Sequence, residues 1–257
     1  MSSAPIDALP TLRLDRRVAI VTGASSGLGT RFAQVLDAAG ASVVLAARRA
    51  EVCAELAAGM RDAIAVPCDV REDGDRSALV SATLDRFGQI DVLVNNAGIA
   101  ASTRAEDEPI GSVRAQLETN VVGLFGLAQL VGRHMLGRGS GSIVNIASPS
   151  AKMSMDRYGL AGYAASKGAV VALTRELAAQ WAGRGVRVNA ISPAWFPSQT
   201  SGWLQDPDQV AWISARSPMG RPGRLSDLDG PLLFLASDAS GYVTGHDLLV
   251  DGGWTAL

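Results

Sequence analysis

Two residues, Tyr163 and Lys167, have the types and the spacing needed for proton transfer. They stand four positions apart in the run Y-A-A-S-K, so on a helix their side chains lie one turn apart on a single face. A free tyrosine titrates near pH ~10 and is a poor proton donor at neutral pH. A lysine ammonium beside it favours the phenolate and brings the pKa of the phenol toward the working range. The pair therefore predicts a general acid/base, although the same spacing also arises by chance.

A glycine-rich turn near the start of the chain has the character of a phosphate-binding loop. Residues 23–29 read G-A-S-S-G-L-G, between an apolar run at 18–22 and an apolar-periodic helix at 28–39. Glycines in such a turn let the backbone come close to a pyrophosphate at the helix N-terminus, where free N–H groups and the helix dipole favour an anion. A turn of this kind can also simply join strand to helix, but its place after the first apolar strand favours a dinucleotide site.

The end of the second predicted strand indicates which dinucleotide binds. A carboxylate there would accept hydrogen bonds from a ribose 2′-hydroxyl, whereas an arginine suits a 2′-phosphate. The chain has Arg48 and Arg49 at this place and no acid. NADP(H) is therefore the preferred cofactor. NAD(H) is the alternative, because two neighbouring arginines are also common on solvated surfaces.

Alternating strands and helices are needed to position these residues. The predicted strands are residues 18–22, 42–47, 63–66, 91–94, 142–147, 186–191 and 247–250. The predicted helices are residues 28–39, 50–60, a segment between 70 and about 87, 110–136, 163–181 and 226–236. Apolar strands that alternate with helices call for a parallel sheet covered on both faces and joined by right-handed crossovers. The predicted fold class is therefore α/β, with three layers.

The composition predicts one globular domain. The 257 residues are 47% hydrophobic and include 28 glycines, so the chain can bury a core without metal or disulfides. No repeat, linker or shift in composition divides it. We expect an N-terminal arm at 1–15, a single domain at 16–257, and a substrate loop at about 194–225, since loops of that length often act as lids.

Charge and cysteine usage narrow the partners and the compartment. A net charge of −2 gives no case for nucleic acid. No signal-peptide pattern is visible, and no apolar run approaches the ~18 residues of a spanning helix, so a membrane is not an expected partner. Cys53 and Cys68 lack ligand-like spacing and are expected to be buried thiols in the cytoplasm. His134 and His246 have no second ligand nearby in the sequence, so no metal site is predicted.

Three motifs together indicate a family. With T-G-A-S-S-G-L-G at 22–29, N-N-A-G at 95–98 and Y-A-A-S-K at 163–167, the sequence resembles the short-chain dehydrogenase/reductase family over about residues 16–254. The resemblance implies a Rossmann-like, doubly wound parallel sheet of about seven strands. It also implies reversible hydride transfer between a nicotinamide and a carbonyl or secondary alcohol.

The resemblance also implies a catalytic tetrad, which consists of Asn120, Ser148, Tyr163 and Lys167. Tyr163 matches the family's acid/base, and Lys167 matches its partner, which also binds the nicotinamide ribose. Asn120 matches the asparagine that holds a water in a proton relay. Ser148 matches the serine that orients the substrate oxygen at the end of a strand. Ser150 is the alternative serine, because the family's usual gap between serine and tyrosine is shorter than the one between Ser148 and Tyr163.

Residues predicted to bind the cofactor come from several places along the chain. They are Gly23, Ser25, Ser26, Gly27, Leu28, Gly29, Arg48, Arg49, Asp69, Val70, Asn96, Ala97, Gly98, Tyr163, Lys167, Pro193, Phe196 and Ser198. By resemblance, residues 69–70 would contact the adenine and residues 96–98 would lie beside the adenosine ribose. Pro193, Phe196 and Ser198 would contact the nicotinamide end.

The substrate end is the least defined by the sequence. Ser150, Trp195 and Trp203 are the predicted substrate contacts, and the aromatic residues around them predict a largely apolar pocket. The predicted function is an NADP(H)-dependent ketone or 3-oxoacyl reductase. The alternatives are an NAD-dependent alcohol or sugar dehydrogenase of the polyol or gluconate type and, more remotely, a nucleotide-binding regulator without catalysis. The partner is a small-molecule substrate. The resemblance also implies a homotetramer, with a homodimer as the alternative.

Overall fold

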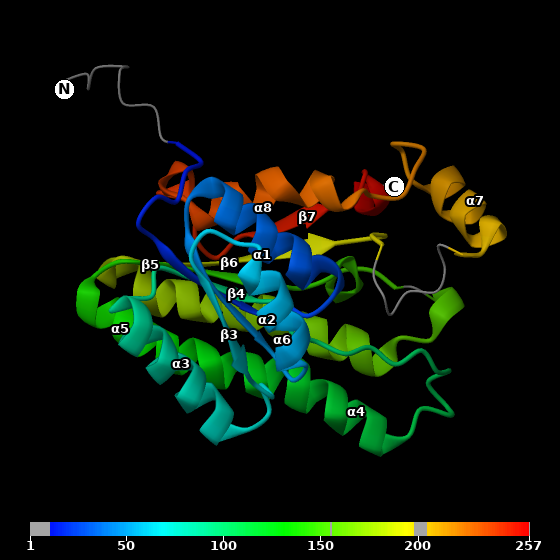
Figure 1. The fold of residues 1–257 in the computed structure, drawn as a ribbon. Coiled ribbons are helices and arrows are strands. Elements are labelled where there is room, and N and C mark those ends of the chain that lie inside the picture. Colours follow the sequence, from blue (N-terminus) through cyan, green and yellow to red (C-terminus); the bar gives the residue numbers. More distant parts are fainter. Residues whose placement is uncertain (1–10, 155, 198–204, 257) are drawn as a thin grey trace.

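A seven-stranded parallel sheet forms the centre of the molecule (Figure 1). The computed structural model describes residues 11–154, 156–197 and 205–256. The strand order is β3-β2-β1-β4-β5-β6-β7. The strands are β1 (Val18–Thr22), β2 (Ser42–Ala47), β3 (Ala63–Pro67), β4 (Val92–Asn95), β5 (Gly141–Ile146), β6 (Val186–Pro193) and β7 (Asp247–Val250). The predicted fold class and all the predicted strands are confirmed, with strand ends shifted by two residues or fewer.

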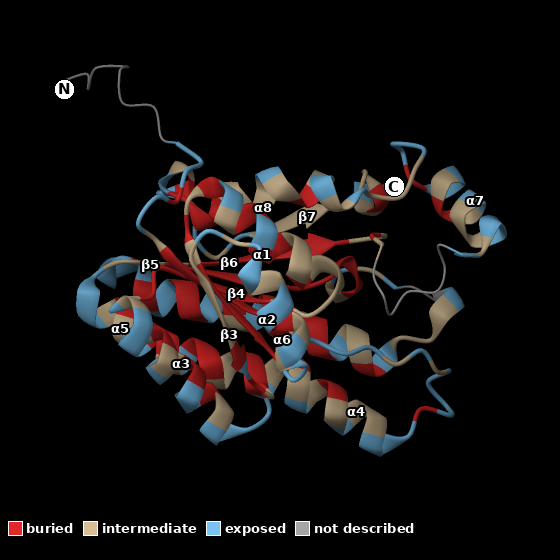
Figure 2. Cartoon of the chain, in the orientation of Figure 1, coloured by how far each residue is buried: buried red, intermediate tan, exposed pale blue. Residues whose placement is uncertain are grey.

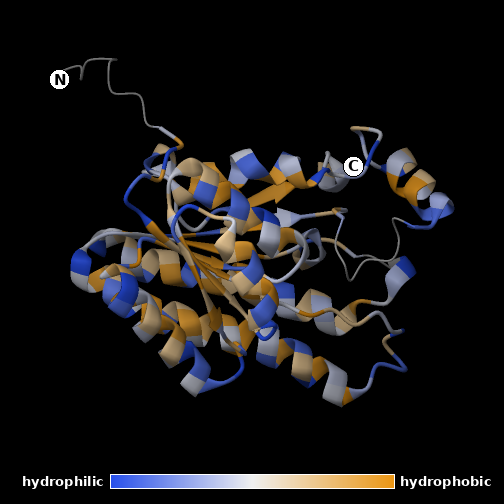
Figure 3. Ribbon diagram, in the orientation of Figure 1, coloured by the Kyte–Doolittle hydropathy of each residue, from blue (hydrophilic) through white to orange (hydrophobic). Residues whose placement is uncertain are grey.

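The central strands are mostly apolar and buried because helices cover both faces of the sheet. β1, with the sequence V-A-I-V-T, is buried throughout, as a β-branched strand inside a parallel sheet should be. Figure 2 shows the buried strands between helices whose outer faces are exposed, and Figure 3 shows the same strands as strongly hydrophobic. β1 pairs with β2 on one side and β4 on the other. The order of connection reverses there, which opens a ligand crevice at the carboxyl ends of the strands.

Helices pack on the sheet in two layers. They are α1 (Gly27–Ala39), α2 (Ala50–Ala58) and α8 (Asp229–Ala236) on one face, and α3 (Asp73–Phe87), α5 (Leu124–Arg138) and α6 (Ala161–Trp181) on the other. Phe32 of α1 and Leu232 of α8 belong to one core cluster. Leu127 of α5 and Leu177 of α6 belong to the second. Within the described residues, none of the helices combines the length and apolarity needed to cross a bilayer.

One predicted helix contains a change of helical type. The segment predicted as a single helix at 110–136 consists of α4 (Ile110–Leu117), a π-helical turn (Glu118–Gly123) and α5. At the end of this turn, a Cβ on Gly123 would lie 2.6 Å from the carbonyl oxygen of Val70. The widened turn therefore coincides with close packing against the loop after β3. Hydrophobic periodicity does not reveal such a contact between distant segments.

A helix also interrupts the stretch predicted as a long loop. α7 (Pro207–Arg216) begins with Asp206 as its N-cap, and the Asp206 carboxylate accepts hydrogen bonds from the N–H groups of Asp208 at 3.0 Å and Gln209 at 3.4 Å. Pro207 occupies the first helical position, where its missing N–H costs nothing. This helix-start signal stands in the sequence, so the prediction of a loop is wrong for this part of 194–225.

Candidate active site

The glycine loop at 23–29 packs too closely to accept side chains at two of its glycines. Gly23 has a φ of +64°, and a Cβ there would lie 2.9 Å from Nδ2 of Asn96. A Cβ on Gly29 would lie 2.2 Å from the carbonyl oxygen of Gly23. Leu28 is partly buried and packs against the hydrophobic core. Both glycines therefore allow the backbone to turn tightly into α1.

Hydrogen bonds from Asn96 hold this loop against the end of β4. The Asn96 side-chain amide donates to the carbonyl oxygens of Thr22 at 2.9 Å and Gly23 at 3.3 Å. The backbone N–H groups of Asn96 and Ala97 each donate to the Thr22 hydroxyl at 3.0 Å. The Asn96 side chain therefore fixes the shape of the loop. Thr22 was not predicted as a site residue, although it stands directly before the first glycine.

The N-terminus of α1 is open to an anion. Ser26 is the N-cap and makes no side-chain capping hydrogen bond, so the first N–H groups of the helix have no capping side chain. A cavity of about 980 Å³ lies beside it, lined by Ser25, Ser26 and Gly27 and, among other residues, by Pro197 and residues 221–226. The open helix end and the closely packed glycines of the loop fit the pyrophosphate of a dinucleotide.

Charged side chains stand at the ends of β2 and β3. Arg49 donates hydrogen bonds to the Ser25 carbonyl oxygen at 3.3 Å and to the Ser25 hydroxyl at 3.1 Å, and Arg48 is exposed. Asp69 forms an ion pair with Arg71 at 2.5 Å. Hydrogen bonding from Arg71 lowers the pKa of Asp69 to about 2, so this carboxylate is ionised at neutral pH. Positive charge therefore lies next to the glycine loop.

Lys167 is buried one helical turn after Tyr163 on α6. Its Nζ donates to the carbonyl oxygen of Ile146 at 2.7 Å and lies 5.7 Å from the centroid of the Tyr163 ring. Burial lowers the pKa of Lys167 to about 8. A Cβ on Gly98 would lie 3.6 Å from this Nζ and 3.1 Å from Oδ1 of Asn120. The end of N-N-A-G therefore forms a wall beside both side chains.

Ser148 is the side chain whose hydrogen bonding bears on the pKa of the Tyr163 phenol. Burial raises the pKa of the Tyr163 phenol, and the hydrogen bond with Ser148 acts in the opposite direction; the overall direction is upward. The sequence led us to expect that Lys167 lowers this pKa. That expectation is wrong for the protein without cofactor, because burial of the phenol has the largest effect and raises its pKa. Ser150 donates to the Ser148 hydroxyl from its own hydroxyl at 2.9 Å and from its N–H at 3.2 Å. Ser150 is thus bonded to Ser148, and Ser148 is the serine that influences the Tyr163 phenol.

Asn120 lies in the π-helical turn and is fully buried. Its side-chain amide donates to the Ile99 carbonyl oxygen at 2.8 Å and to the Ser166 hydroxyl at 2.9 Å, and its Oδ1 accepts from the Ile99 N–H at 2.8 Å. The Ser166 hydroxyl donates to the Tyr163 carbonyl oxygen at 2.7 Å. Asn120 therefore links the segment after N-N-A-G to the helix that carries Tyr163.

Aromatic side chains from four separate segments meet near the end of β6. Trp195 lies 5.2 Å from Tyr158 and 5.5 Å from Trp254, measured between ring centroids. Trp212 on α7 lies 6.0 Å from Tyr158 and 6.1 Å from Trp195. We call Tyr158, Trp195, Trp212 and Trp254 the aromatic cluster. Of these, only Trp195 was predicted as a substrate contact; the rings of Tyr158 and Trp254 come together with it through tertiary contacts.

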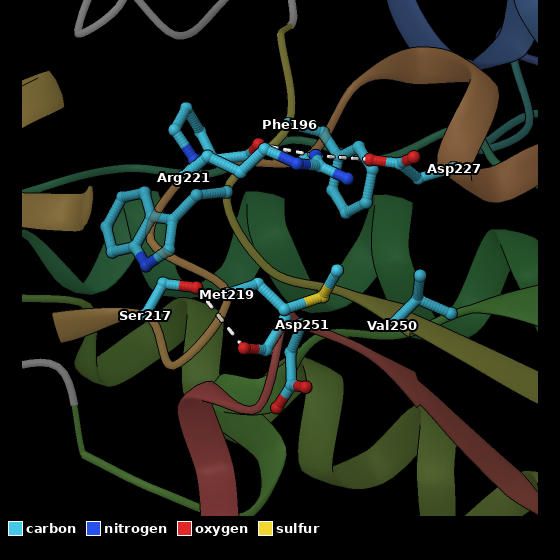
Figure 4. Close-up of a pocket in the computed structure, with 11 residues that line it drawn as sticks. Phe196, Ser217, Met219, Arg221, Asp227, Val250 and Asp251 are labelled. Atoms are coloured by element: carbon cyan, nitrogen blue, oxygen red, sulfur yellow. Dashed lines mark hydrogen bonds and ion pairs between the residues drawn. The ribbon is translucent and has the colours of Figure 1, made fainter.

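A smaller cavity of about 240 Å³ includes Trp195 of the aromatic cluster in its lining (Figure 4). Phe196 and Val250 line it, together with the ion pair between Arg221 and Asp227, in which the two charged atoms are 2.6 Å apart. Phe196 is buried, and a Cβ on Gly223 would lie 2.4 Å from its ring. Pro193 ends β6 and pairs with Val250. Phe196 is thus largely a packing residue, and the predicted contacts Ser198 and Trp203 lie outside the described residues.

Known proteins resemble this chain over nearly its whole length. A family model described as enoyl-(acyl carrier protein) reductase matches residues 23–255. The chain is 38% identical over 247 residues to D-threitol dehydrogenase of Mycolicibacterium smegmatis, covering 95% of this chain and 94% of that relative. It is 38% identical over 242 residues to gluconate 5-dehydrogenase of Gluconobacter oxydans, covering 92% and 94%.

Solved structures agree with this relationship. A gluconate 5-dehydrogenase from Burkholderia cenocepacia, in complex with NADP and tartrate, has a TM-score of 0.91 at 38% identity and covers 97% of this chain and 99% of its own. Levodione reductase has a TM-score of 0.88 at 31% identity and covers 95% and 99%. Because the family model and these relatives span nearly the whole chain, the protein belongs to the short-chain dehydrogenase/reductase family of NAD(P)-dependent oxidoreductases, as its motifs predicted.

Proposed function

We propose that this oxidoreductase uses NADP(H) to interconvert a ketone and a secondary alcohol, with Tyr163 as the group that gives and takes the proton. Membership of the family supports the reaction class. The observation that carries the role of Tyr163 is its position one helical turn before the buried Lys167, whose Nζ lies 5.7 Å from the centroid of the Tyr163 ring. The nicotinamide supplies or accepts the hydride when it is bound.

The protein's own residues supply position and a proton. In the reductive direction, the Tyr163 hydroxyl protonates the substrate oxygen as that oxygen gains negative charge, and Ser148 donates a hydrogen bond to the same oxygen. The ammonium of Lys167 stabilises the phenolate that remains. We assign Asn120 to the relay that returns a proton to Tyr163, since it joins the Ile99 backbone to Ser166 beside the tyrosine.

Positive charge beside the glycine loop supports NADP(H) over NAD(H). Arg48 is exposed at the end of β2, and Arg49 is bound to Ser25 of the loop. This is the place where the 2′-phosphate of a dinucleotide bound at the switch point would lie. The gluconate 5-dehydrogenase from Burkholderia cenocepacia was solved with NADP.

A polyol or sugar acid is the second candidate class of substrate. D-threitol dehydrogenase and gluconate 5-dehydrogenase are both similar to this chain over more than nine-tenths of its length. The aromatic cluster points instead to a substrate with an apolar surface, because aromatic rings are large hydrophobic contacts. Both classes carry the same reacting group, a secondary alcohol or its ketone.

A substrate panel tests the proposal. Purified protein is incubated with D-threitol, galactitol, gluconate and apolar secondary alcohols and ketones, each with both nicotinamide cofactors, while the cofactor absorbance is followed. We expect turnover with at least one pair, faster with the NADP(H) form. Tyr163→Phe should lower kcat by at least about 10²-fold while cofactor still binds, and the exposed Tyr242→Phe serves as the control. Bound cofactor without turnover across the panel favours a non-catalytic regulator, and turnover in Tyr163→Phe contradicts its role.

Assembly and compartment complete the proposal. We expect residues 16–257 to act as one catalytic domain within a cytoplasmic homotetramer. The exposed apolar side chains of Ile110 and Val122 support burial of this surface between subunits, and the buried free thiols of Cys53 and Cys68 support a reducing compartment. Light scattering should give four times the chain mass; twice that mass indicates the homodimer, and a monomer contradicts the proposal.

A further inference from the structure

The first turn of α6, which carries Tyr163, receives its cap from a distant part of the chain. Its N-cap residue Leu160 makes no side-chain capping hydrogen bond, and the turn contains no acidic residue. The first N–H groups of a helix have no partner within the helix. Glu108 supplies one, because its Oε2 accepts a hydrogen bond from the Gly162 N–H at 3.0 Å across 54 residues of sequence.

Gln116 on α4 holds Glu108 in this position. Its Nε2 donates to Oε1 of Glu108 at 2.8 Å, and its Oε1 accepts from the Ala101 N–H at 3.1 Å. Glu108 is 9% exposed and Gln116 1% exposed, so water does not replace these bonds. The result is a buried chain of hydrogen bonds, which we call the Glu108 relay; it runs from Ala101 through Gln116 and Glu108 to Gly162.

The fit at Gly162 leaves no room for a side chain. A Cβ on Gly162 would lie 2.7 Å from Oε1 of Glu108 and 2.9 Å from Nε2 of Gln116. The carboxylate and amide therefore approach the backbone of α6 as closely as a glycine allows. Tyr163 is the next residue, so the relay acts directly beside the proposed proton donor.

A second set of hydrogen bonds fixes the other side of the same turn. Asn120, four residues after Gln116, donates to the Ser166 hydroxyl at 2.9 Å, and Ser166 donates to the Tyr163 carbonyl oxygen at 2.7 Å. Tyr163 is thus held through Gly162 before it and through Ser166 after it. Gln116 and Asn120, which make these two sets of hydrogen bonds, come from α4 and the π-helical turn that follows it.

We infer that Glu108 and Gln116 are positioning residues that set the place of the Tyr163 hydroxyl relative to Ser148 by fixing the first turn of α6. This inference rests on the proposed role of Tyr163. Misplacement of a catalytic group by about 1 Å can cost about 10²-fold in rate. A change in the hydrogen bonds of the Glu108 relay should therefore lower the reaction rate. A cap that only stabilises the fold would change stability and leave the environment of the Tyr163 phenol as it is.

Exchanging the two side-chain types tests the hydrogen-bond pattern. In Glu108→Gln, the new amide at position 108 faces the amide of Gln116. In every orientation of the two amides, at least one NH₂ group faces another NH₂ group or a backbone N–H, so one hydrogen bond of the relay is lost. The double variant Glu108→Gln with Gln116→Glu removes this conflict. Its amide at position 108 would accept from the Gly162 N–H and donate to the carboxylate at position 116, which would accept from the Ala101 N–H. Glu106→Gln, an exposed neighbour, is the matched control.

Two readouts are compared, and the first needs no turnover. The ionisation of the Tyr163 phenol is titrated by ultraviolet difference absorbance, with Tyr163→Phe subtracted in each background. We expect Glu108→Gln to move the midpoint by about half a pH unit or more and to lower kcat about tenfold with KM changed less than about threefold. The double variant should return both toward wild type, and Glu106→Gln should change neither.

The outcomes separate this inference from the proposed function. A wild-type titration in Glu108→Gln, or a folded double variant that stays at the level of Glu108→Gln, overturns the inference. If Glu108→Gln does not fold, the double variant alone decides, because the inference requires it to titrate as the wild type does. Absence of turnover in the wild-type protein would refute the proposed function, whereas the phenol titration would still decide the role of the relay.

Discussion

At the scale of single residues, Ser148 and Ser150 differ in how their hydroxyls are held. Hydrogen bonding from Ser148 lowers the pKa of the Tyr163 phenol, against the larger effect of burial. The hydroxyl of Ser150 donates to Ser148 at 2.9 Å. We therefore expect Ser148 to donate to a substrate oxygen beside Tyr163 and Ser150 to orient Ser148.

Replacing each serine in turn should separate these tasks. We expect Ser148→Ala to lower kcat by about 10²- to 10³-fold, the usual cost of removing a donor to a developing oxyanion. Ser150→Ala should lower kcat by about tenfold or less, because Ser148 still contacts Tyr163. Steady-state kinetics with the best substrate of the panel measures both variants. A larger loss in Ser150→Ala would reverse the assignment.

Arg48 is the residue on which the choice of nucleotide should depend. A carboxylate at the end of the second strand repels a 2′-phosphate and accepts hydrogen bonds from a 2′-hydroxyl. Arg48→Asp should therefore raise KM for NADPH by about tenfold or more and leave KM for NADH unchanged or lower. Arg61→Asp, at another partly exposed arginine, is the control. Equal effects on the two cofactors would place the 2′-phosphate elsewhere.

At the scale of elements, α7 is fastened to the rest of the molecule by aromatic contacts. Trp212 on this helix lies 5.5 Å from Trp254, and the Arg216 guanidinium at the end of the helix lies over the Trp254 ring, with its central carbon 5.9 Å from the ring centroid. Tyr158 comes from the segment between Ser148 and Tyr163. The helix is thus linked to the same segment that carries the proposed substrate donor.

Removing the ring of Trp212 should loosen α7 over the substrate side. Trp212 contacts three aromatic rings, each worth about 0.5–1.5 kcal/mol beyond its buried area. Trp212→Ala should raise KM for the substrate roughly tenfold and speed proteolytic cleavage within α7, with cofactor affinity unchanged. Asp208→Asn, an exposed residue on the same helix, should resemble wild type. Unchanged KM and cleavage in Trp212→Ala would show that α7 does not cover the substrate.

At the scale of the whole molecule, the end of the sheet opposite the site is held by a polar network. Asp91 is buried just before β4 and accepts from the Val18 N–H at 2.8 Å and from Arg138 at 3.0 Å. His134 accepts a hydrogen bond from the Ile90 N–H at 3.2 Å through Nε2. This bond requires a neutral imidazole. Burial, helped by the charge of Arg138, lowers the pKa of His134.

Stability should therefore fall in mild acid because of His134. The unfolded chain binds a proton to this histidine near pH ~6.5, above the folded value, so its contribution is present above that pH and is lost as the pH falls toward the folded pKa. His134→Gln should cost about 1 kcal/mol at neutral pH and should show a smaller loss of unfolding free energy between pH ~7.5 and pH ~5. Urea unfolding measures this. His246→Gln, at an exposed histidine, should retain the wild-type pH dependence.

Local patterns predicted the elements well and their irregularities poorly. The apolar run at β1 and the glycines at 23–29 predicted strand, turn and helix, because burial on both faces and close backbone approach each demand particular residue types. The cap of α7 at Asp206 was also present in the sequence and was overlooked. The π-helical turn at Glu118–Gly123 leaves no comparable signal, since it accompanies packing between distant segments.

By itself the sequence determined the fold class, the family and the Tyr163–Lys167 pair, because hydrophobic period, glycine spacing and a four-residue separation are written along the chain. The tertiary structure alone decided that Asn120 bonds Ser166 beside Tyr163, that Asn96 shapes the glycine loop, and that Glu108 caps α6. These contacts join residues far apart in sequence. Their geometry depends on how the helices lie on the sheet, and no spacing along the chain records it.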